Sequence, residues 1–77
     1  MFEYNICNAA DEDIFEKQCK AIERKLPAAL KESVLEDVDG SKIQKFTLTH
    51  DEINIYLDYP VGAVYIKSSI DLEKIFS

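Results

Sequence analysis

The stretch from Phe46 to Lys67 constrains the fold more than any other part of the chain, because apolar and polar residues alternate in three short segments of it. The apolar positions of these segments are Phe46, Leu48, Ile53, Ile55, Leu57, Val64 and Ile66. Alternation with a period of two is typical of strands that bury one face. The sequence therefore predicts three antiparallel strands, at residues 41–49, 52–58 and 63–67.

Two turns between these segments set the expected register of the strands. One turn lies at His50-Asp51, and the other crosses the four residues from Tyr59 to Gly62, where proline fixes φ and glycine accepts positive φ. The expected opposite pairs are Leu48 with Ile53, Phe46 with Ile55, Leu57 with Val64 and Ile55 with Ile66. A slip of one residue would move every side chain to the other face, so the single apolar face selects this register.

A strand pattern and a helix pattern precede the meander. Phe2, Tyr4 and Ile6 alternate with polar residues and with Cys7, which predicts a half-buried strand. A helix is expected from about residue 11 to residue 25, with Asn8 as a candidate cap or turn residue. Its apolar residues recur at steps of three and four: Phe15, Cys19, Ile22 and Leu26. Acidic residues crowd its first turns and basic residues its later turns, as the helix dipole favours.

The segment from Pro27 to Gly40 allows two interpretations. Pro27 ends the first helix, because the residue before a proline is driven away from helical angles. In the preferred interpretation, a short helix at 27–32 is followed by a strand at about 34–38 and a two-residue turn at Asp39-Gly40. That turn gives the expected pairs Asp37 with Lys42 and Val34 with Lys45. In the alternative, the short helix continues and Gly40 is its C-cap.

A short C-terminal helix completes the expected fold. Ser68 or Ser69 caps it, with Asp71 as the second member of a capping box. Three apolar residues are expected to dock it: Ile70, Ile75 and Phe76. The expected fold class is α+β, an antiparallel β-sheet meander of three to five strands with one main amphipathic helix packed on one face and the short C-terminal helix. Residues 1–77 are expected to form a single domain.

The charge balance and the cysteine content narrow the class of protein. The chain carries a net charge of −6, whereas nucleic-acid binders usually carry a basic surplus, so no direct nucleic-acid binding is expected. The N-terminus has no basic region followed by an apolar run, and no segment reaches the roughly 20 apolar residues of a membrane span. We therefore expect a cytoplasmic protein without membrane contact. Cys7 and Cys19 are expected to be free thiols, with a disulfide between them as the alternative.

The residue pattern indicates neither a catalytic set nor a metal or cofactor site. His50 is the single histidine, and it falls in a predicted turn with no nucleophile and base placed to meet it. The acidic residues at 11–16 are spread around a helix and cannot converge on one cation. Two cysteines and one histidine are fewer than the four ligands of a zinc site, and the two glycines form no phosphate-binding loop. The chain is therefore expected to be non-enzymatic and to use no cofactor.

The polar face of the meander is the candidate site. In the expected register Tyr56 faces Tyr65 at its centre, Lys45 lies opposite Tyr56, and Thr47 lies opposite Asn54. Tyrosines combine an apolar ring with a polar tip and are enriched in protein interfaces. Six residues are predicted to bind a partner: Lys45, Asn54, Tyr56, Asp58, Tyr65 and Lys67. The alternative is that the tyrosines only stabilise the sheet as a cross-strand pair.

The leading functional hypothesis is a small acidic binding protein of the inhibitor or immunity type, which contacts a protein partner with a basic surface. A structural homodimer that pairs edge strands or buries the tyrosine face is an alternative, and a small enzyme ranks last. The segment Leu35 to Gly40, continued into three strands after an amphipathic helix, resembles the first half of type III secretion chaperones over about residues 15–68. Those chaperones are small, acidic and dimeric, so the resemblance implies a dimeric export chaperone, although the second half of their fold has no counterpart here.

Overall fold

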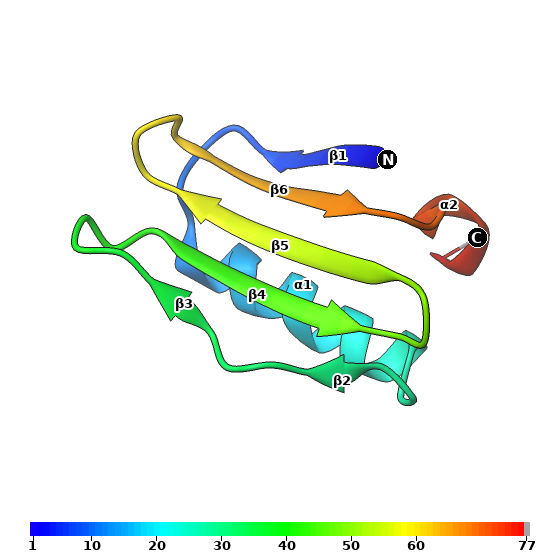
Figure 1. Cartoon of the computed structure of the whole chain (residues 1–77). Coiled ribbons are helices and arrows are strands. Elements are labelled where there is room, and N and C mark those ends of the chain that lie inside the picture. The colour runs from blue at the N-terminus through cyan, green and yellow to red at the C-terminus, as the bar shows by residue number, and fades with distance from the viewer. Residues whose placement is uncertain (77) are drawn as a thin grey trace.

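The computed structural model describes residues 1–76 and contains a six-stranded antiparallel sheet, a long helix across one face of the sheet and a short helix at one end (Figure 1). The elements in chain order are β1 (Phe2–Cys7), α1 (Glu12–Lys25), β2 (Leu30–Lys31), β3 (Leu35–Glu36), β4 (Lys42–Thr47), β5 (Glu52–Asp58), β6 (Ala63–Ser68) and α2 (Leu72–Phe76). The strand order is β1-β6-β5-β4-β2, and β3 also pairs with β4. The predicted α+β class is confirmed, with one main helix and a short C-terminal helix.

Helix α1 begins where a carboxylate satisfies its first backbone amides. The Asp11 side chain accepts hydrogen bonds from the N–H groups of Asp13 (2.9 Å) and Ile14 (3.2 Å). Asp11 is therefore the N-cap, and the helix starts at the next residue. Asn8 does not cap the helix, because its Oδ1 accepts a hydrogen bond from a side chain of β1. The helix ends shortly before Pro27, as predicted.

The core lies between α1 and the central strands. Three residues of α1 are buried there: Phe15, Cys19 and Ile22. The buried apolar residues of β4, β5 and β6 that pack with them are Phe46, Ile53, Ile55, Leu57, Val64 and Ile66. The alternation predicts this face for each of them, and the predicted Leu26 and Leu48 pack at its margin. Full burial of a side chain of this size stabilises the fold by on the order of 2 kcal/mol.

The hairpin between β5 and β6 has the predicted register. Its pairs are Asn54 with Lys67, Ile55 with Ile66, Tyr56 with Tyr65, Leu57 with Val64 and Asp58 with Ala63. The turn also lies where the sequence predicts it. The Gly62 N–H donates to the Asp58 carbonyl at 2.8 Å, and Gly62 has a φ of 71°. Positive φ costs glycine no steric energy, so this residue type closes the turn.

The hairpin between β4 and β5 is shifted by two residues from the predicted register. Phe46, not Leu48, lies opposite Ile53, and Gln44, not Phe46, lies opposite Ile55. The favoured two-residue turn needs positive φ at both central residues, and no described residue except glycine has positive φ. The predicted turn at 50–51 was therefore wrong, and the chain turns through four residues, with the Leu48 N–H donating to the Asp51 carbonyl at 2.8 Å. A shift of two leaves every side chain on its predicted face.

The segment after α1 runs along the edge of the sheet and does not form a second helix. The chain turns at Pro27, and Leu30–Lys31 then pairs with β4 as β2. The Glu32 N–H donates to the Lys45 carbonyl at 3.0 Å. The predicted helix at 27–32 was wrong because a six-residue helix leaves most of its backbone groups without partners, whereas pairing with β4 satisfies some of them.

The predicted strand at 34–38 is present as the two-residue strand β3, but its register differs by one residue. Leu35 lies opposite Ile43 and Glu36 opposite Lys42, in place of the predicted pairs Val34 with Lys45 and Asp37 with Lys42. The loop has three residues, since the Gly40 N–H donates to the Asp37 carbonyl and the Asp37 N–H donates to the Ser41 carbonyl. Gly40 has a φ of 91°, as the last residue of such a loop requires. The alternative of Gly40 as a helix C-cap was therefore also wrong.

Strand β1 and the start of helix α2 meet beside β6, where Tyr4 bonds to Asp71 and Leu72. Strand β1 pairs with β6, and a bulge between Asn5 and Cys7 turns both Ile6 and Cys7 toward the α1 side. Asp71, rather than a serine, caps α2, because its Oδ1 accepts a hydrogen bond from the Glu73 N–H at 3.0 Å. The predicted serine caps were wrong. Ser68 Oγ bonds to the backbone of Ile70. Ser69 Oγ bonds to Asp51, in the loop before β5, and to Glu52, the first residue of β5.

The C-terminal helix docks on the core through Leu72, which is buried, with Ile70 and Ile75 packed beside it. Docking of Ile70 and Ile75 is thus confirmed, while the predicted docking of Phe76 lies outside the described side chains. Neither helix within residues 1–76 has the length and apolar character needed to cross a membrane.

The packing of α1 makes a direct prediction about stability. Ile22 is 0% exposed, so Ile22→Ala is expected to lower the free energy of unfolding by about 2–5 kcal/mol in urea denaturation. Lys20→Ala on the exposed side of the same helix is the matched control and is expected to change it by less than about 0.5 kcal/mol. Equal effects of the two substitutions would contradict the placement of the core.

Candidate protein-binding face

The sheet has one face that no other element of the described chain covers. Figure 1 shows α1 behind the sheet, and the near face carries only strands. We call this surface the open sheet face; its residues on the four long strands are Glu3, Asn5, Ile43, Lys45, Thr47, Glu52, Asn54, Tyr56, Asp58, Ala63, Tyr65 and Lys67. All six predicted partner-binding residues lie on it.

Two tyrosines form the centre of the open sheet face. The rings of Tyr56 and Tyr65 are stacked, with centroids 4.7 Å apart and an angle of 12° between their planes. The Lys67 ammonium lies 5.7 Å from the Tyr56 centroid and 6.0 Å from the Tyr65 centroid. Ring stacking of this kind stabilises a pair by about 0.5–1.5 kcal/mol. The lysine also shows that the tyrosine rings can receive a cation.

A carboxylate holds one tyrosine in place. The Tyr65 hydroxyl donates a hydrogen bond of 2.8 Å to Asp58 Oδ2, and the other oxygen of Asp58 accepts the Val61 N–H at 3.2 Å. Burial raises the pKa of Tyr65 to about 12, and the hydrogen bond to Asp58 and the charge of that carboxylate add to the effect. Asp58 thus links the Tyr65 side chain to the backbone of the β5–β6 turn.

Charges on the open sheet face are largely balanced within it. The Lys45 ammonium lies 3.8 Å from a carboxylate oxygen of Glu52, and the Lys67 ammonium lies 3.5 Å from one of Glu3. These pairs are partly exposed and contribute little to stability. With Asp58, the face carries three carboxylates and two lysines, so it has only a small acidic excess.

Asn54 stands out because it is poorly satisfied where it lies. The residue is only 7% exposed, and its Oδ1 is buried without a hydrogen-bond donor among the described residues. Its Nδ2 reaches Glu52 Oε1 at 3.5 Å, which is a weak contact. A buried acceptor without a donor costs about 1–3 kcal/mol, and asparagine is disfavoured in strands. Asn54 therefore costs the sheet stability at the position where it lies.

The neighbours of the predicted residues differ from the sequence expectation. The predicted pairs Lys45 with Tyr56 and Thr47 with Asn54 were wrong; Ile43 lies opposite Tyr56, Lys45 opposite Asn54 and Thr47 opposite Glu52. Sequence reasoning also missed Glu3 and Glu52, the partners of the two lysines. Glu3 was missed because nothing in the local pattern of β1 reveals its pairing with β6. Glu52 was missed because the register between β4 and β5 depends on the turn.

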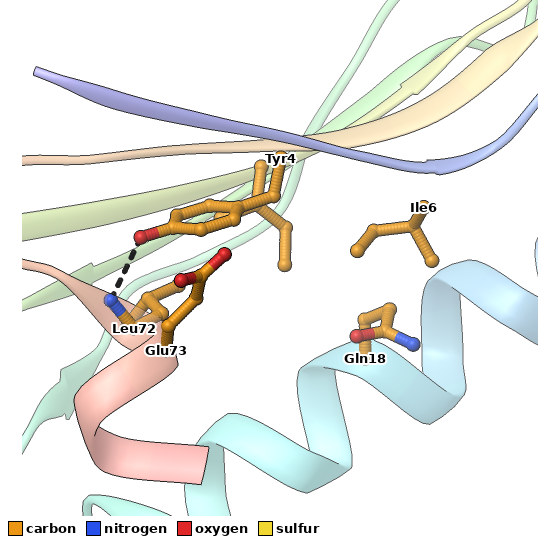
Figure 2. Close-up of a pocket in the computed structure, with 6 residues that line it drawn as sticks. Tyr4, Ile6, Gln18, Leu72 and Glu73 are labelled. Atoms are coloured by element: carbon orange, nitrogen blue, oxygen red, sulfur yellow. Dashed lines mark hydrogen bonds between the residues drawn. The ribbon is translucent and has the colours of Figure 1, made fainter. Parts of the chain in front are cut away.

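A hollow lies on the helix side of the sheet, between β1, α1 and α2 (Figure 2). Its lining is almost entirely apolar, and its volume is about 180 Å³. The Tyr4 hydroxyl closes one end, where it accepts the Leu72 N–H at 2.9 Å and donates to Asp71 at 3.1 Å. Pockets that bind cofactors or drug-sized ligands measure roughly 300–1,000 Å³. This hollow is smaller and has few polar groups, so it fits the docking of α2 better than the binding of a ligand.

Reactive side chains are not gathered at any point of the described chain. His50 is exposed in the β4–β5 loop, and no three histidine, cysteine, aspartate or glutamate side chains within residues 1–76 are placed to share a metal ion. Cys7 and Cys19 are free thiols, as predicted. Burial raises the pKa of Cys19 to about 11, so its thiol stays protonated and is a weak nucleophile at neutral pH.

Comparison with known proteins adds no further evidence: no protein family, no curated protein and no solved structure matches the chain.

The orphan acceptor of Asn54 leads to a prediction about stability. Asn54→Val removes the buried carbonyl and supplies a residue with high strand propensity, so the free energy of unfolding is expected to rise by about 1 kcal/mol. Thr47→Val, on the same face but without an orphan acceptor, is the control and is expected to change it by less. Urea denaturation measures both, and a destabilised Asn54→Val variant would contradict the interpretation.

The Tyr65–Asp58 hydrogen bond leads to a prediction about pH. The folded-state pKa of Tyr65 is raised, so its contribution to stability is complete below about pH 10 and is lost as the pH rises toward 12. Asp58→Asn is expected to lower the pKa of Tyr65 but to leave it above its ordinary value, because burial is the larger cause. Carbon-13 NMR of labelled tyrosine ring carbons measures this pKa, and an unchanged value in Asp58→Asn would rule out the coupling.

Proposed function

We propose that the chain is a non-enzymatic binding protein that contacts a protein partner through the open sheet face. The observation that carries this proposal is the stacked Tyr56–Tyr65 pair at the centre of a face that no described element covers. A helix covers the opposite face, which supplies the core on its own. The open sheet face combines the aromatic centre and polar rim that are characteristic of protein interfaces.

The composition of the face supports a partner that brings cationic side chains. Lys67 already lies over the tyrosine rings, the Asp58 carboxylate accepts the Tyr65 hydroxyl, and the face carries one more carboxylate than lysines. The net charge of −6 would also speed the approach of a basic protein.

An inhibitor or immunity-type role in the cytoplasm is the form of this function that we propose. A protein of this kind binds its target tightly enough to block it and needs no chemistry of its own.

Site-specific photo-crosslinking tests the proposal. A benzophenone amino acid in place of Tyr56 is expected to give one predominant covalent adduct in lysate of the source cells. The same amino acid in place of Lys17, on the exposed side of α1, is the matched control and is expected to give none. Excess unlabelled wild-type protein should suppress the adduct, whereas excess Tyr56→Thr/Tyr65→Thr protein should not, because it lacks the aromatic centre.

Three outcomes of this experiment bear on the proposal in different ways. Equal adducts from the two positions, or suppression by the Tyr56→Thr/Tyr65→Thr protein, would contradict binding at the open sheet face. An adduct of twice the mass of the chain would identify the partner as a second copy, which replaces the inhibitor role with a structural homodimer. Light scattering of the purified protein checks that result independently.

A further inference from the structure

One edge of the sheet ends in a short strand whose outer side meets no other element of the described chain. Strand β3 is two residues long and pairs only with β4. Every residue from Lys31 to Asp39 is exposed. We call residues 32–39 the β3 edge. Its apolar residues are not hidden, since Val34 is 46% and Leu35 is 65% exposed.

The backbone of the β3 edge offers hydrogen bonds outward. The Asp37 N–H donates to the Ser41 carbonyl at 2.8 Å, and Leu35 lies opposite Ile43 in the same register. In an antiparallel ladder every second residue directs its N–H and C=O toward the neighbouring strand. Glu36, which lies between Leu35 and Asp37, therefore directs these groups away from β4. An exposed edge of this kind is a template for one more strand.

The charge of the β3 edge is one-sided, in contrast to the open sheet face. Four carboxylates lie between residues 32 and 41, those of Glu32, Glu36, Asp37 and Asp39. The two lysines that flank this segment are ion-paired with α1: Lys31 pairs with Glu23, and Lys42, which lies opposite Glu36, pairs with Glu12. The ion pairs in the described chain use other glutamates, so Glu32 and Glu36 have no cationic partner there. A second copy of the chain would bring the same carboxylates against them, and like charges on paired strands are destabilising. The edge is therefore complementary to a basic strand.

Cavities lie on both sides of the β3 edge. On the helix side a cavity of about 370 Å³ is lined by the apolar Val34, Phe15 and Cys19 and by charged side chains of both signs, including Lys20, Lys31 and Lys42. On the open side a cavity of about 250 Å³ is lined by Leu35 and Ile43 among others. Successive side chains of a strand point to opposite faces. The side chains of a strand added at this edge would thus reach the two cavities in turn, and their aliphatic parts would meet the exposed apolar residues.

We propose that the β3 edge binds an extended protein segment that carries alternating basic and aliphatic side chains, by addition of that segment as a further strand of the sheet. Main-chain hydrogen bonds provide the affinity in this mode of recognition, and the flanking pockets provide the specificity. The proposal goes beyond the role of the open sheet face, because it requires neither Tyr56 nor Tyr65 and holds whether or not these two residues bind a partner.

Titration of the full chain with a synthetic peptide of alternating lysine and valine tests the proposal. Amide shifts in the nitrogen-15 NMR spectrum are expected at residues 32–45, and the affinity is expected to fall as salt is raised. A peptide of alternating glutamate and valine should not bind. The lysine–valine peptide with N-methyl groups on alternate amides should bind at least tenfold more weakly, since it cannot pair with the edge.

Two variants of one residue separate charge from strand pairing. Glu36→Gln keeps the outward N–H and removes the charge, so the dissociation constant for the lysine–valine peptide should rise about fivefold. Glu36→Pro also removes the N–H, without loss of a hydrogen bond to β4, and should weaken binding at least tenfold further. Glu3→Gln, on the opposite edge strand, and Tyr56→Thr should bind the peptide as the wild type does, which distinguishes this site from the open sheet face.

Several results would overturn the proposal. The first is that the N-methylated peptide binds as tightly as the unmodified lysine–valine peptide. The second is that Glu36→Gln and Glu36→Pro have the same affinity for that peptide. The others are amide shifts confined to Tyr56, Tyr65 and their neighbours, or no binding at millimolar peptide. Shifts at the β3 edge that depend on protein concentration without peptide would show that a second copy occupies it, which also overturns the proposal. If Glu36→Pro lowers the unfolding temperature, strand pairing is tested instead by the affinities of the wild-type protein for the unmodified and the N-methylated lysine–valine peptides.

Discussion

The burial of the apolar face of strand β5 is the constraint on which the rest of the structure depends. Ile53, Ile55 and Leu57 are enclosed by α1 and by the neighbouring strands. A strand with a period of two sends its other side chains to the opposite face, and here no described element covers that face. The same alternation that builds the core thus also presents Tyr56 and its neighbours to the surroundings. One face of β5 thus stabilises the fold, and the other face carries the residues proposed to bind a partner.

The two candidate surfaces divide the chemistry of the molecule between them. The open sheet face is aromatic at its centre and nearly balanced in charge, whereas the β3 edge is aliphatic and strongly acidic. They adjoin, since one cavity is lined by Asp37 of the edge as well as by Ile43, Tyr56 and Tyr65 of the face. Part of the negative charge of the chain is therefore concentrated at the β3 edge, where a further strand is proposed to bind.

The accuracy of sequence reasoning followed the strength of local signals. The β5–β6 hairpin has alternating strands and a turn with both proline and glycine, so its register and its tyrosine pair could be predicted. The β4–β5 turn lacks glycine, and its predicted register was wrong by two residues. At the β3 hairpin, Gly40 marked the turn but not the length of the loop, and the register was wrong by one. The segment after Pro27 has helix-forming residues, yet pairing with β4 decided its conformation.

For α1 and for strands β4, β5 and β6 the sequence by itself determined which side chains share a face, because the two periods of strand and helix act within a few residues and survive a shift of two. It thereby determined the core, the α+β class and the membership of all six predicted residues in one surface. Only the tertiary structure decided which residues are neighbours across strands, because that depends on loop lengths and on contacts between distant segments. The pairing of β1 with β6, the ion pairs of Glu3 and Glu52, the orphan carbonyl of Asn54 and the exposed acidic edge at β3 all arise at that level.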